Sequence, residues 1–448
     1  MLIFKPKDLR EKYAVRQLHY LLSIEFSDNI NLFLAGQFID ISEQEIAILI
    51  NPNKDEYKGG SNNLIFIHSN IINMIFDYFS LKNEQSMKKD SLERTVFSKK
   101  DLERLKEPII DKEIFRIRQE ICNKLDQISF KYQQTFLSEK PIICLTHDVD
   151  SLKAKSWTRI FFWLISGLIN FSIFQSLSRS WQLFKTPRDE HGSFEEFMQL
   201  ETSFSFKSTY FFLSLPFFLG SEGRRYRIKK SSIKKSIQKL THEGFEVGLH
   251  TSRKASLNIL ALKNEISRLR EAIGNKPSYL GVRNHYLSGS FQHIWSTYEN
   301  LGFLYDSTLG WHNYNGYRSG TSMPYTPYDL KNKKTYEIYE LPQIIMDGSI
   351  EDRSSEEIFE DVKFFVDQTK KHNTVLTISW HTNRIIGREF ENYSKAYLLA
   401  LNYLKELNFI SLTASEIIHR TQSYQKRVKK NLFIQKDSLN KLTSHDLN

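Results

Sequence analysis

Four histidines stand at or just past the ends of predicted strands, where α/β proteins place catalytic side chains. They lie in the runs LTHDVD, EVGLH, GVRNH and ISWH and are His147, His250, His285 and His381. Asp148 and Asp150 follow the first of them, and Arg283 precedes the third by two residues. The carboxyl ends of parallel strands in an α/β barrel meet at one rim. We therefore expect these side chains to form one constellation.

These residue types suit metal-assisted hydrolysis. Zinc binds imidazole nitrogen and carboxylate oxygen, and a catalytic zinc keeps a position open for water. The ion lowers the pKa of that water and polarises a carbonyl group. A carboxylate that an arginine orients can take the water's proton, and a further imidazole can protonate the leaving group.

Each residue also has a purely structural interpretation. The two aspartates suit the N-terminal cap of a following helix, and Arg283 suits a structural ion pair with either of them. His250 could simply be a polar residue at the end of a strand, and His285 could donate a hydrogen bond to a loop carbonyl. His381 could be a rim histidine after a buried tryptophan. The joint occurrence of these residues at several strand ends favours the site.

Short apolar runs alternate with helical patterns from Pro141 onwards. The predicted strands are Ile142–Thr146, Ser208–Leu213, Glu246–His250, Tyr279–Arg283, Tyr336–Leu341 and Thr374–Trp380. The predicted helices are Phe194–Phe204, Lys230–Glu243, Leu257–Ile273, Phe291–Leu301, Ser355–Lys371 and Asn392–Leu407. This alternation predicts an α/β protein with a parallel sheet or barrel.

The chain divides into three parts. Residues 1–135 form a separate N-terminal α+β unit without a cluster of reactive residues, 136–421 form the barrel, and 422–448 form a basic, flexible tail. Residues 160–178 carry no charge but are too polar for a confident membrane span. We expect them to lie on a membrane surface or to pack on the N-terminal unit.

Composition narrows the class of protein. Of the 448 residues, 40% are hydrophobic and 25% are charged, which is typical of a folded chain. The net charge of +10 is not accompanied by a nucleic-acid-binding motif, so we expect no nucleic-acid partner. Cys122 and Cys144 lie in apolar runs and suit reduced core residues. The start, MLIFKPKDLREKY, lacks the apolar run of a secretory signal, which favours the cytoplasm.

A series of motifs resembles a known family. In chain order they are LTHDVD, KSTYFF, GFEVGLHTS, GVRNHYL, YDSTLGW, YELPQIIMDG and TISWHTN. Together they resemble the polysaccharide deacetylase family, carbohydrate esterase family 4 or NodB-like, in its bacterial branch with HDVD. The resemblance covers about residues 141–420 and implies a distorted (β/α) barrel and a divalent metal, usually zinc.

The resemblance also implies roles by position. Asp148 matches the catalytic base and Asp150 a metal ligand, while His250 matches the first metal histidine. Arg283 matches the arginine that orients the base, and His381 matches the general acid. The residues expected to line the substrate groove are Tyr305, Asp306, Ser307 and Trp380.

One motif departs from the family pattern. The second motif of the family usually carries two metal histidines, and here Lys254 in HTSRK stands in the place of the second. A protonated lysine cannot bind a cation. His285, at the same rim, is the expected substitute, and the alternative is a weakened or absent metal site.

The expected function is removal of acetyl groups from a sugar of a polysaccharide or glycan precursor of the cell envelope, capsule or lipopolysaccharide. The expected cofactor is a divalent metal, most simply zinc. The expected partner is a carbohydrate or lipid-linked sugar, with peripheral contact to the inner membrane face through 160–178. The alternatives are a carbohydrate-binding pseudoenzyme, to which Lys254 points, and a membrane-associated scaffold in polysaccharide assembly.

Overall fold

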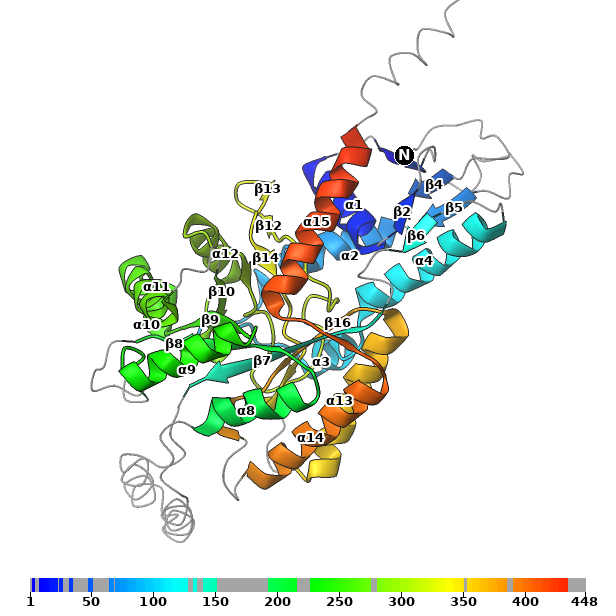
Figure 1. The fold of residues 1–448 in the computed structure, drawn as a ribbon. Coiled ribbons are helices and arrows are strands. Elements are labelled where there is room, and N and C mark those ends of the chain that lie inside the picture. Colours follow the sequence, from blue (N-terminus) through cyan, green and yellow to red (C-terminus); the bar gives the residue numbers. More distant parts are fainter. Residues whose placement is uncertain are drawn as a thin grey trace, which may run out of the picture.

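A curled sheet of parallel strands forms the centre of the structure, which is a computed structural model (Figure 1). It describes residues 2–4, 8–22, 24–26, 32–34, 47–50, 64–67, 69–127, 132–134, 140–150, 192–215, 226–274, 280–349, 353–384 and 390–433. The strand order is β14-β11-β10-β9-β8-β7-β16-β15, and β17 also pairs with β7. Within the described residues β14 and β15 end this path, so the sheet forms an open, distorted (β/α) barrel, as predicted.

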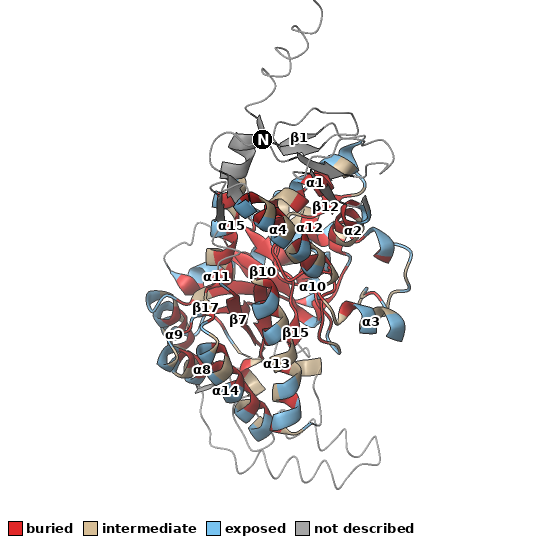
Figure 2. Cartoon of the chain, turned by 90° about the vertical axis from the view of Figure 1, so that its right-hand side faces the viewer, coloured by how far each residue is buried: buried red, intermediate tan, exposed pale blue. Residues whose placement is uncertain are grey.

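The strands of this barrel are short except for β7. Their bounds are β7 (Ile142–Val149), β8 (Ser208–Leu213), β9 (Glu246–Thr251), β10 (Gly281–Asn284), β11 (Tyr305–Asp306), β14 (Tyr339–Glu340), β15 (Ile345–Met346), β16 (Val375–Ser379) and β17 (Ile410–Ser411). All eight residues of β7 are buried, because it has a strand on either side and helices cover the sheet. Figure 2 shows this buried centre beneath helices whose outer faces are exposed. An apolar run of this kind is what a central parallel strand needs.

Helices connect the strands and cover the sheet. They are α8 (Gly192–Ser203), α9 (Ser231–His242), α10 (Arg253–Leu257), α11 (Ile259–Ile273), α12 (Phe291–Asn300), α13 (Ser355–His372), α14 (Glu391–Glu406) and α15 (Ala414–Phe433). Short 3-10 turns η3 (His285–Leu287), η4 (Asp347–Ser349) and η5 (Thr382–Arg384) follow β10, β15 and β16. Helix α13 begins with a capping box between Ser354 and Glu357, and Asn373, with a left-handed φ of 50°, caps its C-terminal end.

The N-terminal part contains helices and paired short strands. The helices are α1 (Leu9–Leu22), α2 (Ser69–Phe79), α3 (Lys99–Leu105) and α4 (Ile109–Gln127), with the 3-10 turn η2 (Lys82–Glu84). The strands are β1 (Leu2–Phe4), β2 (Ile24–Phe26), β3 (Leu32–Leu34), β4 (Ala47–Ile50), β5 (Leu64–Ile67) and β6 (Tyr132–Gln134), paired as β1–β3, β4–β5 and β2–β6. Two further short strands of the barrel region, β12 (Tyr328–Asp329) and β13 (Lys334–Thr335), pair with each other.

The N-terminal part shares one continuous hydrophobic core with the barrel. Helix α15 lies beside α1 (Figure 1), where the hydroxyl of Tyr20 donates to Thr421 at 3.3 Å. Asp111 of α4 accepts hydrogen bonds from the amide and hydroxyl of Ser322, each at 2.9 Å. The described helices of this part are therefore packed against the barrel, although the assignment of residues 1–135 as a separate unit stays a prediction.

Several sequence predictions differ from the structure in detail. The expected strand at Tyr336–Leu341 is only the two-residue β14, and the short strands β11, β15 and β17 were not predicted. They have two residues each, too few to produce an alternating pattern. The predicted tail boundary at 422 falls inside α15, and residues 434–448 and 160–178 lie outside the described residues.

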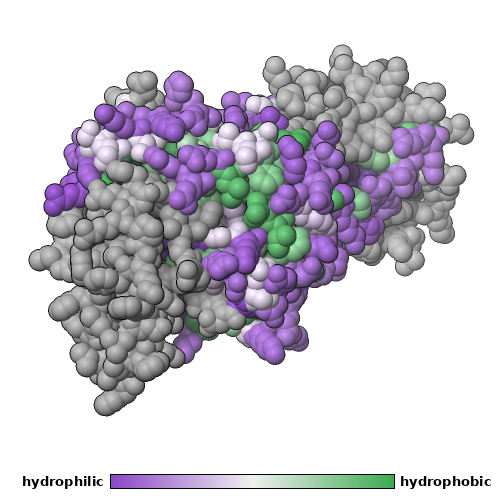
Figure 3. Space-filling model, turned by 60° about the horizontal axis from the view of Figure 1, so that its bottom comes forward, coloured by the Kyte–Doolittle hydropathy of each residue, from purple (hydrophilic) through white to green (hydrophobic). Residues whose placement is uncertain are grey.

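Figure 3 shows the hydropathy of one face of the molecule. On the face drawn in Figure 3, hydrophobic side chains gather near the middle and hydrophilic side chains surround them. Among the helices that the structure describes, none combines the length and the low polarity that a membrane span requires.

Candidate active site

The strand ends β7, β9, β10 and β16 meet at one rim, as the sequence predicts. His250 of β9 and Arg283 of β10 are register partners, and Thr146 of β7 is the partner of Ser379 in β16. Asp148 lies in β7 and Asp150 follows it, so the two carboxylates are on one side of an extended chain. This register brings residues more than 200 positions apart in sequence to one place.

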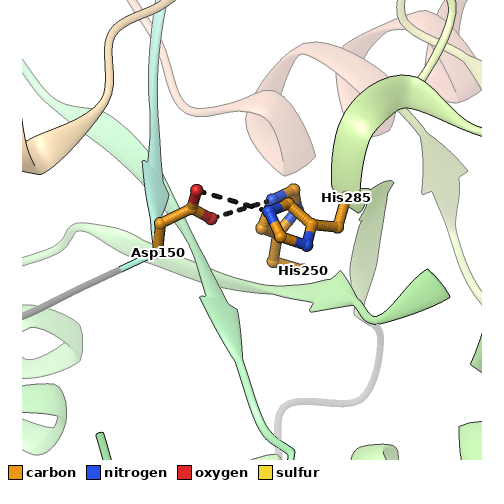
Figure 4. Close-up of side chains that lie close together, drawn as sticks. All are labelled: Asp150, His250 and His285. Atoms are coloured by element: carbon orange, nitrogen blue, oxygen red, sulfur yellow. Dashed lines mark ion pairs between the residues drawn. The ribbon is translucent and has the colours of Figure 1, made fainter. Parts of the chain in front are cut away.

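Asp150, His250 and His285 form a compact group (Figure 4). The Nε2 atom of His250 lies 3.4 Å from Oδ1 of Asp150, and Nε2 of His285 lies 3.3 Å from Oδ2. One ligand atom from each residue lies within 4.8 Å of the other two. In the described part of the chain, this is the one group of three or more histidine, cysteine, aspartate or glutamate side chains whose ligand atoms all lie within 4.8 Å of one another.

The orientation of His250 is set by the backbone of its neighbouring strand. Its Nδ1 atom lies 3.0 Å from the carbonyl oxygen of Arg283. A carbonyl only accepts, so Nδ1 carries the proton and, in the neutral ring, Nε2 has a free lone pair directed at Asp150. Metal-binding histidines commonly have their other ring nitrogen fixed in this way. The donor set of two imidazoles and one carboxylate thus fits a divalent metal such as zinc.

Lys254 does not enter this group. It lies in α10 and is exposed, whereas His250 and His285 are buried with side-chain exposures of 2% and 4%. The third donor stands instead in η3, directly after β10. His285 therefore occupies the position that the sequence analysis assigned to it, and its role as a ligand stays a proposal.

Arg283 is fully buried and uses its guanidinium to hold the candidate base. Its Nη1 donates to Oδ1 of Asp148 at 2.8 Å, and also to Thr146 Oγ1 and Ser379 Oγ at 2.9 and 3.1 Å. Its Nε and Nη2 donate to the carbonyl and hydroxyl of Ser307, each at 2.9 Å. Residues of β7 and β16 and the residue that follows β11 thus fix the guanidinium, and the guanidinium fixes the carboxylate.

The surroundings of Asp148 favour its ionised form. Burial alone raises the pKa of this carboxyl, but Arg283, then His250 and His381, outweigh burial and hold the pKa below its ordinary value. Its other oxygen, Oδ2, lies 4.0 Å from Nε2 of His250. A general base must be ionised to accept a proton, and Asp148 meets this requirement beside the candidate metal ligands.

His381 pairs with Asp347, a residue to which the sequence analysis gave no role. Nδ1 of His381 lies 2.6 Å from Oδ1 of Asp347, and its amide donates to Oδ2 at 3.0 Å. Burial lowers the pKa of His381, but Asp347 outweighs it and, with Asp148 and Asp150, raises the pKa to about 9. Asp347 follows the two-residue strand β15, and the missed strand explains why the residue was missed.

The four residues expected to line the substrate groove are all buried. The Tyr305 hydroxyl donates to Glu246 at 2.8 Å, and Asp306 accepts from the amide of Thr308 at 3.0 Å. Ser307 supports Arg283, and the Trp380 carbonyl lies 2.9 Å from Nδ1 of His147. These contacts favour a supporting role, and the assignment to substrate binding stays a prediction.

His147 belongs to a buried network behind the rim. Its Nε2 lies 2.7 Å from Oε1 of Glu201, which also accepts from the hydroxyl of Tyr397 at 2.5 Å. The other oxygen of Glu201 accepts from Ser208 at 2.6 Å. Because Trp380 directly precedes His381, the His147–Trp380 contact links this network to the candidate acid.

Comparisons with known proteins give likeness of fold only. No protein-family model and no curated protein matches the chain. A structure from Mycobacterium smegmatis assigned as a polysaccharide deacetylase has a TM-score of 0.42 and 14% identity, over 63% of this chain and 91% of that one. PuuE allantoinase has a TM-score of 0.41 and 12% identity, over 63% and 90%.

A family 4 acetyl xylan esterase from Clostridium thermocellum, solved with a cobalt ion, is also similar. Its TM-score is 0.31 with 11% identity, over 62% of this chain and 90% of that one. Polysaccharide deacetylases are thus among the structures that this chain resembles, as its motifs predicted. The TM-scores lie below 0.5, so function is argued from the site alone.

Proposed function

We propose that the protein is a metal-dependent hydrolase that removes acetyl groups from a sugar of a polysaccharide or glycan precursor. The observation that carries this proposal is the meeting of three groups at one rim. They are the Asp150–His250–His285 cluster, the Asp148–Arg283 pair and the His381–Asp347 pair. Together they offer a metal site, a base and an acid, which hydrolysis of an amide or ester uses.

Asp150, His250 and His285 would hold the metal ion. Two imidazoles and one carboxylate match the ligand sets of catalytic zinc, so zinc is the ion that we propose. When bound, such an ion supplies Lewis acidity that polarises an acetyl carbonyl and acidifies water.

The chain's own residues account for the proton transfers. Asp148, ionised beside Arg283, takes a proton from the attacking water while the water oxygen forms a bond to the acetyl carbon. His381, protonated through Asp347, gives a proton to the departing nitrogen or oxygen of the sugar as its bond to the acetyl carbon breaks. The products are acetate and a free amine or hydroxyl on the sugar. Arg283 and Asp347 act as positioning residues, because each holds one of the two proton-transfer groups.

The substrate that we propose is an intracellular, lipid-linked precursor of a capsule, lipopolysaccharide or other envelope glycan. The net charge of +10 supports an anionic substrate or membrane surface near the protein. Contact with the inner membrane face through residues 160–178 is part of the same proposal, and that segment lies outside the described residues.

The test is acetate release by the zinc-loaded full chain from N-acetylated oligosaccharides and from O-acetylated xylan. We expect release from at least one of these substrates, and loss of release after removal of zinc by a chelator, with recovery when zinc is returned. A protein that binds oligosaccharide but neither binds zinc nor releases acetate would instead be a carbohydrate-binding pseudoenzyme.

A further inference from the structure

A hairpin of the N-terminal part lies against the rim of the barrel. We call residues 88–96 the rim hairpin. The amide of Val96 donates to the carbonyl of Lys88 at 2.9 Å, and the amide of Asp90 donates to the carbonyl of Arg94 at 2.9 Å. Lys89 and Thr95 form an isolated antiparallel bridge between these two bonds. The segment therefore has a defined backbone shape of its own.

Asp90 fixes the tip of the rim hairpin. Its Oδ1 accepts from the amides of Leu92 and Arg94 at 2.8 and 3.0 Å, and its Oδ2 accepts from Nε of Arg94 at 2.7 Å. Glu93 between them has a left-handed φ of 61°. A carboxylate that bonds amides two and four residues ahead closes a tight turn.

The base of the rim hairpin is anchored in the barrel by a buried ion pair. Arg318 donates from Nε and Nη2 to the two carboxylate oxygens of Glu84, at 3.0 and 2.6 Å. Thr95 of the hairpin donates to the same carboxylate at 2.6 Å. Arg318 also donates to the carbonyl of Gly310 at 2.8 Å. The side chains of Arg318 and Glu84 have exposures of 3% and 9%, so a bidentate pair holds the base in place.

The tip contacts both segments that carry the histidines of the candidate metal site. Arg253, three residues after His250, donates to the carbonyl of Ser91 at 3.1 Å. The amide of Gly289, four residues after His285, donates to the carbonyl of Leu92 at 3.1 Å. A third, longer bond of 3.4 Å joins Nη1 of Arg94 to the carbonyl of Tyr286.

The turn that carries His285 needs such support. Tyr286 and Leu287 both adopt left-handed backbone conformations, with φ of 62° and 51°. Non-glycine residues with positive φ are unfavourable and persist where surrounding structure imposes them. The ring of Tyr286 stacks on that of His285 at 3.8 Å between centroids, so the turn and the imidazole are placed together.

We infer that the rim hairpin positions His285 as a metal ligand, so that the N-terminal part of the chain completes the metal site. The inference rests on one part of the proposed function, the binding of a metal ion by Asp150, His250 and His285. The third donor stands in an unfavourable turn after β10 and not in α10, where Lys254 lies exposed. The hairpin bonds to that turn and to the start of α10, and so fixes the distance between the His250 and His285 segments. Asp90 and Arg94 are positioning residues in this account.

The experiment compares Asp90→Ala with Asp8→Ala in the full chain. Asp8 is a matched control, because its Oδ1 accepts from the amides of Arg10 and Glu11, each at 2.9 Å, and its Oδ2 pairs with the Arg10 side chain at 2.7 Å. The dissociation constant for zinc is measured by competition with a chromophoric chelator. The absorption spectrum of the cobalt-loaded protein reports the ligand geometry. Melting of the metal-free form reports stability.

We expect Asp90→Ala to weaken zinc binding by about tenfold or more, as loss of residues that orient a ligand commonly does. We expect its cobalt spectrum to change, whereas Asp8→Ala keeps the affinity and spectrum of the unaltered chain. Arg94→Ala leaves the hydrogen bond between Asp90 and the Leu92 amide in place. If Asp90→Ala does not fold, zinc binding by Arg94→Ala tests the inference instead.

Zinc binding by Asp90→Ala and Arg94→Ala that equals that of the unaltered chain would overturn the inference. Asp150→Ala separates this outcome from failure of the proposed metal site. Loss of zinc in Asp150→Ala with normal binding in Asp90→Ala refutes only the role of the rim hairpin. Normal zinc binding in Asp150→Ala refutes the metal site itself.

Discussion

The carboxylate of Asp347 binds both the backbone amide and the ring of His381. The amide nitrogen of His381 lies 3.0 Å from Oδ2 of Asp347, and Nδ1 of His381 lies 2.6 Å from Oδ1. The carboxylate is fully buried, and Nε of Arg384 lies 3.4 Å from its Oδ2. Because Nδ1 is engaged, Nε2 is the ring atom left to exchange a proton with a substrate.

The Asp347–His381 pair predicts the alkaline side of the pH profile. Asp347 stabilises the imidazolium and raises the pKa of His381 to about 9, and a general acid must be protonated to act. Activity should therefore fall as the pH rises through the pKa of His381, which the charge of a bound metal would place below 9. Asp347→Asn removes the stabilising charge and should move this limb to lower pH by about one to two units. Profiles of kcat measure the shift.

The control for this prediction is Asp367→Asn. Asp367 is a carboxylate on α13 that accepts a hydrogen bond from the Tyr403 hydroxyl at 2.6 Å, away from the rim. Its replacement should leave the profile in place. An unchanged alkaline limb in Asp347→Asn would rule out His381 as the group that sets it.

Replacement of Asp148 by asparagine should abolish most catalysis without loss of the fold. Asparagine keeps an oxygen that can accept from Arg283 but cannot take a proton at neutral pH. We expect kcat to fall by about 10²- to 10⁴-fold, the usual contribution of a general base. Asp329→Asn is the control, because Asp329 closes the turn at Lys331 and Asn332, outside the site. Acetate release near that of the unaltered chain would exclude Asp148 as the base.

Metal affinity should depend on His285 and not on Lys254. His285→Ala removes one of the three donors and should weaken zinc binding by at least about tenfold. Lys254→Ala alters an exposed side chain outside the donor group and should leave zinc binding unchanged. Chelator competition compares the two variants directly. The reverse order of effects would place the third donor in α10.

The network around Glu201 predicts a large effect on stability. Glu201→Ala removes the partner of buried His147, Tyr397 and Ser208 at once. Breaking a buried pair of this kind costs about 3–5 kcal/mol. Gln199→Ala, which alters an exposed side chain on the same helix, should change the free energy of unfolding by less than about 0.5 kcal/mol. Urea unfolding measures both, and equal effects would contradict a buried polar network.

The sequence was informative where patterns were long. The apolar run before Asp148, and the polar residues that end it, predicted both a buried strand and the rim. The histidines His250, His285 and His381 were predicted as site residues because each follows a recognisable strand or motif. The structure brings His285, and not Lys254, beside Asp150 and His250, while the role of His285 as a ligand stays a prediction.

Other features depend on contacts between distant segments and leave no local signal. Asp347 follows a strand of two residues, so neither the strand nor the pairing with His381 could be read from periodicity. The contact between the rim hairpin and Gly289 joins residues nearly 200 positions apart. The buried state of Tyr305 likewise follows from packing, which its place in a motif did not reveal.

The most direct test of the account is a crystal structure of the zinc-loaded full chain, with anomalous scattering recorded on both sides of the zinc edge. The account predicts one anomalous peak within bonding distance, about 2.0–2.2 Å, of Asp150, His250 and His285. A zinc ion at another group of residues, or no ion at saturating zinc, would contradict it.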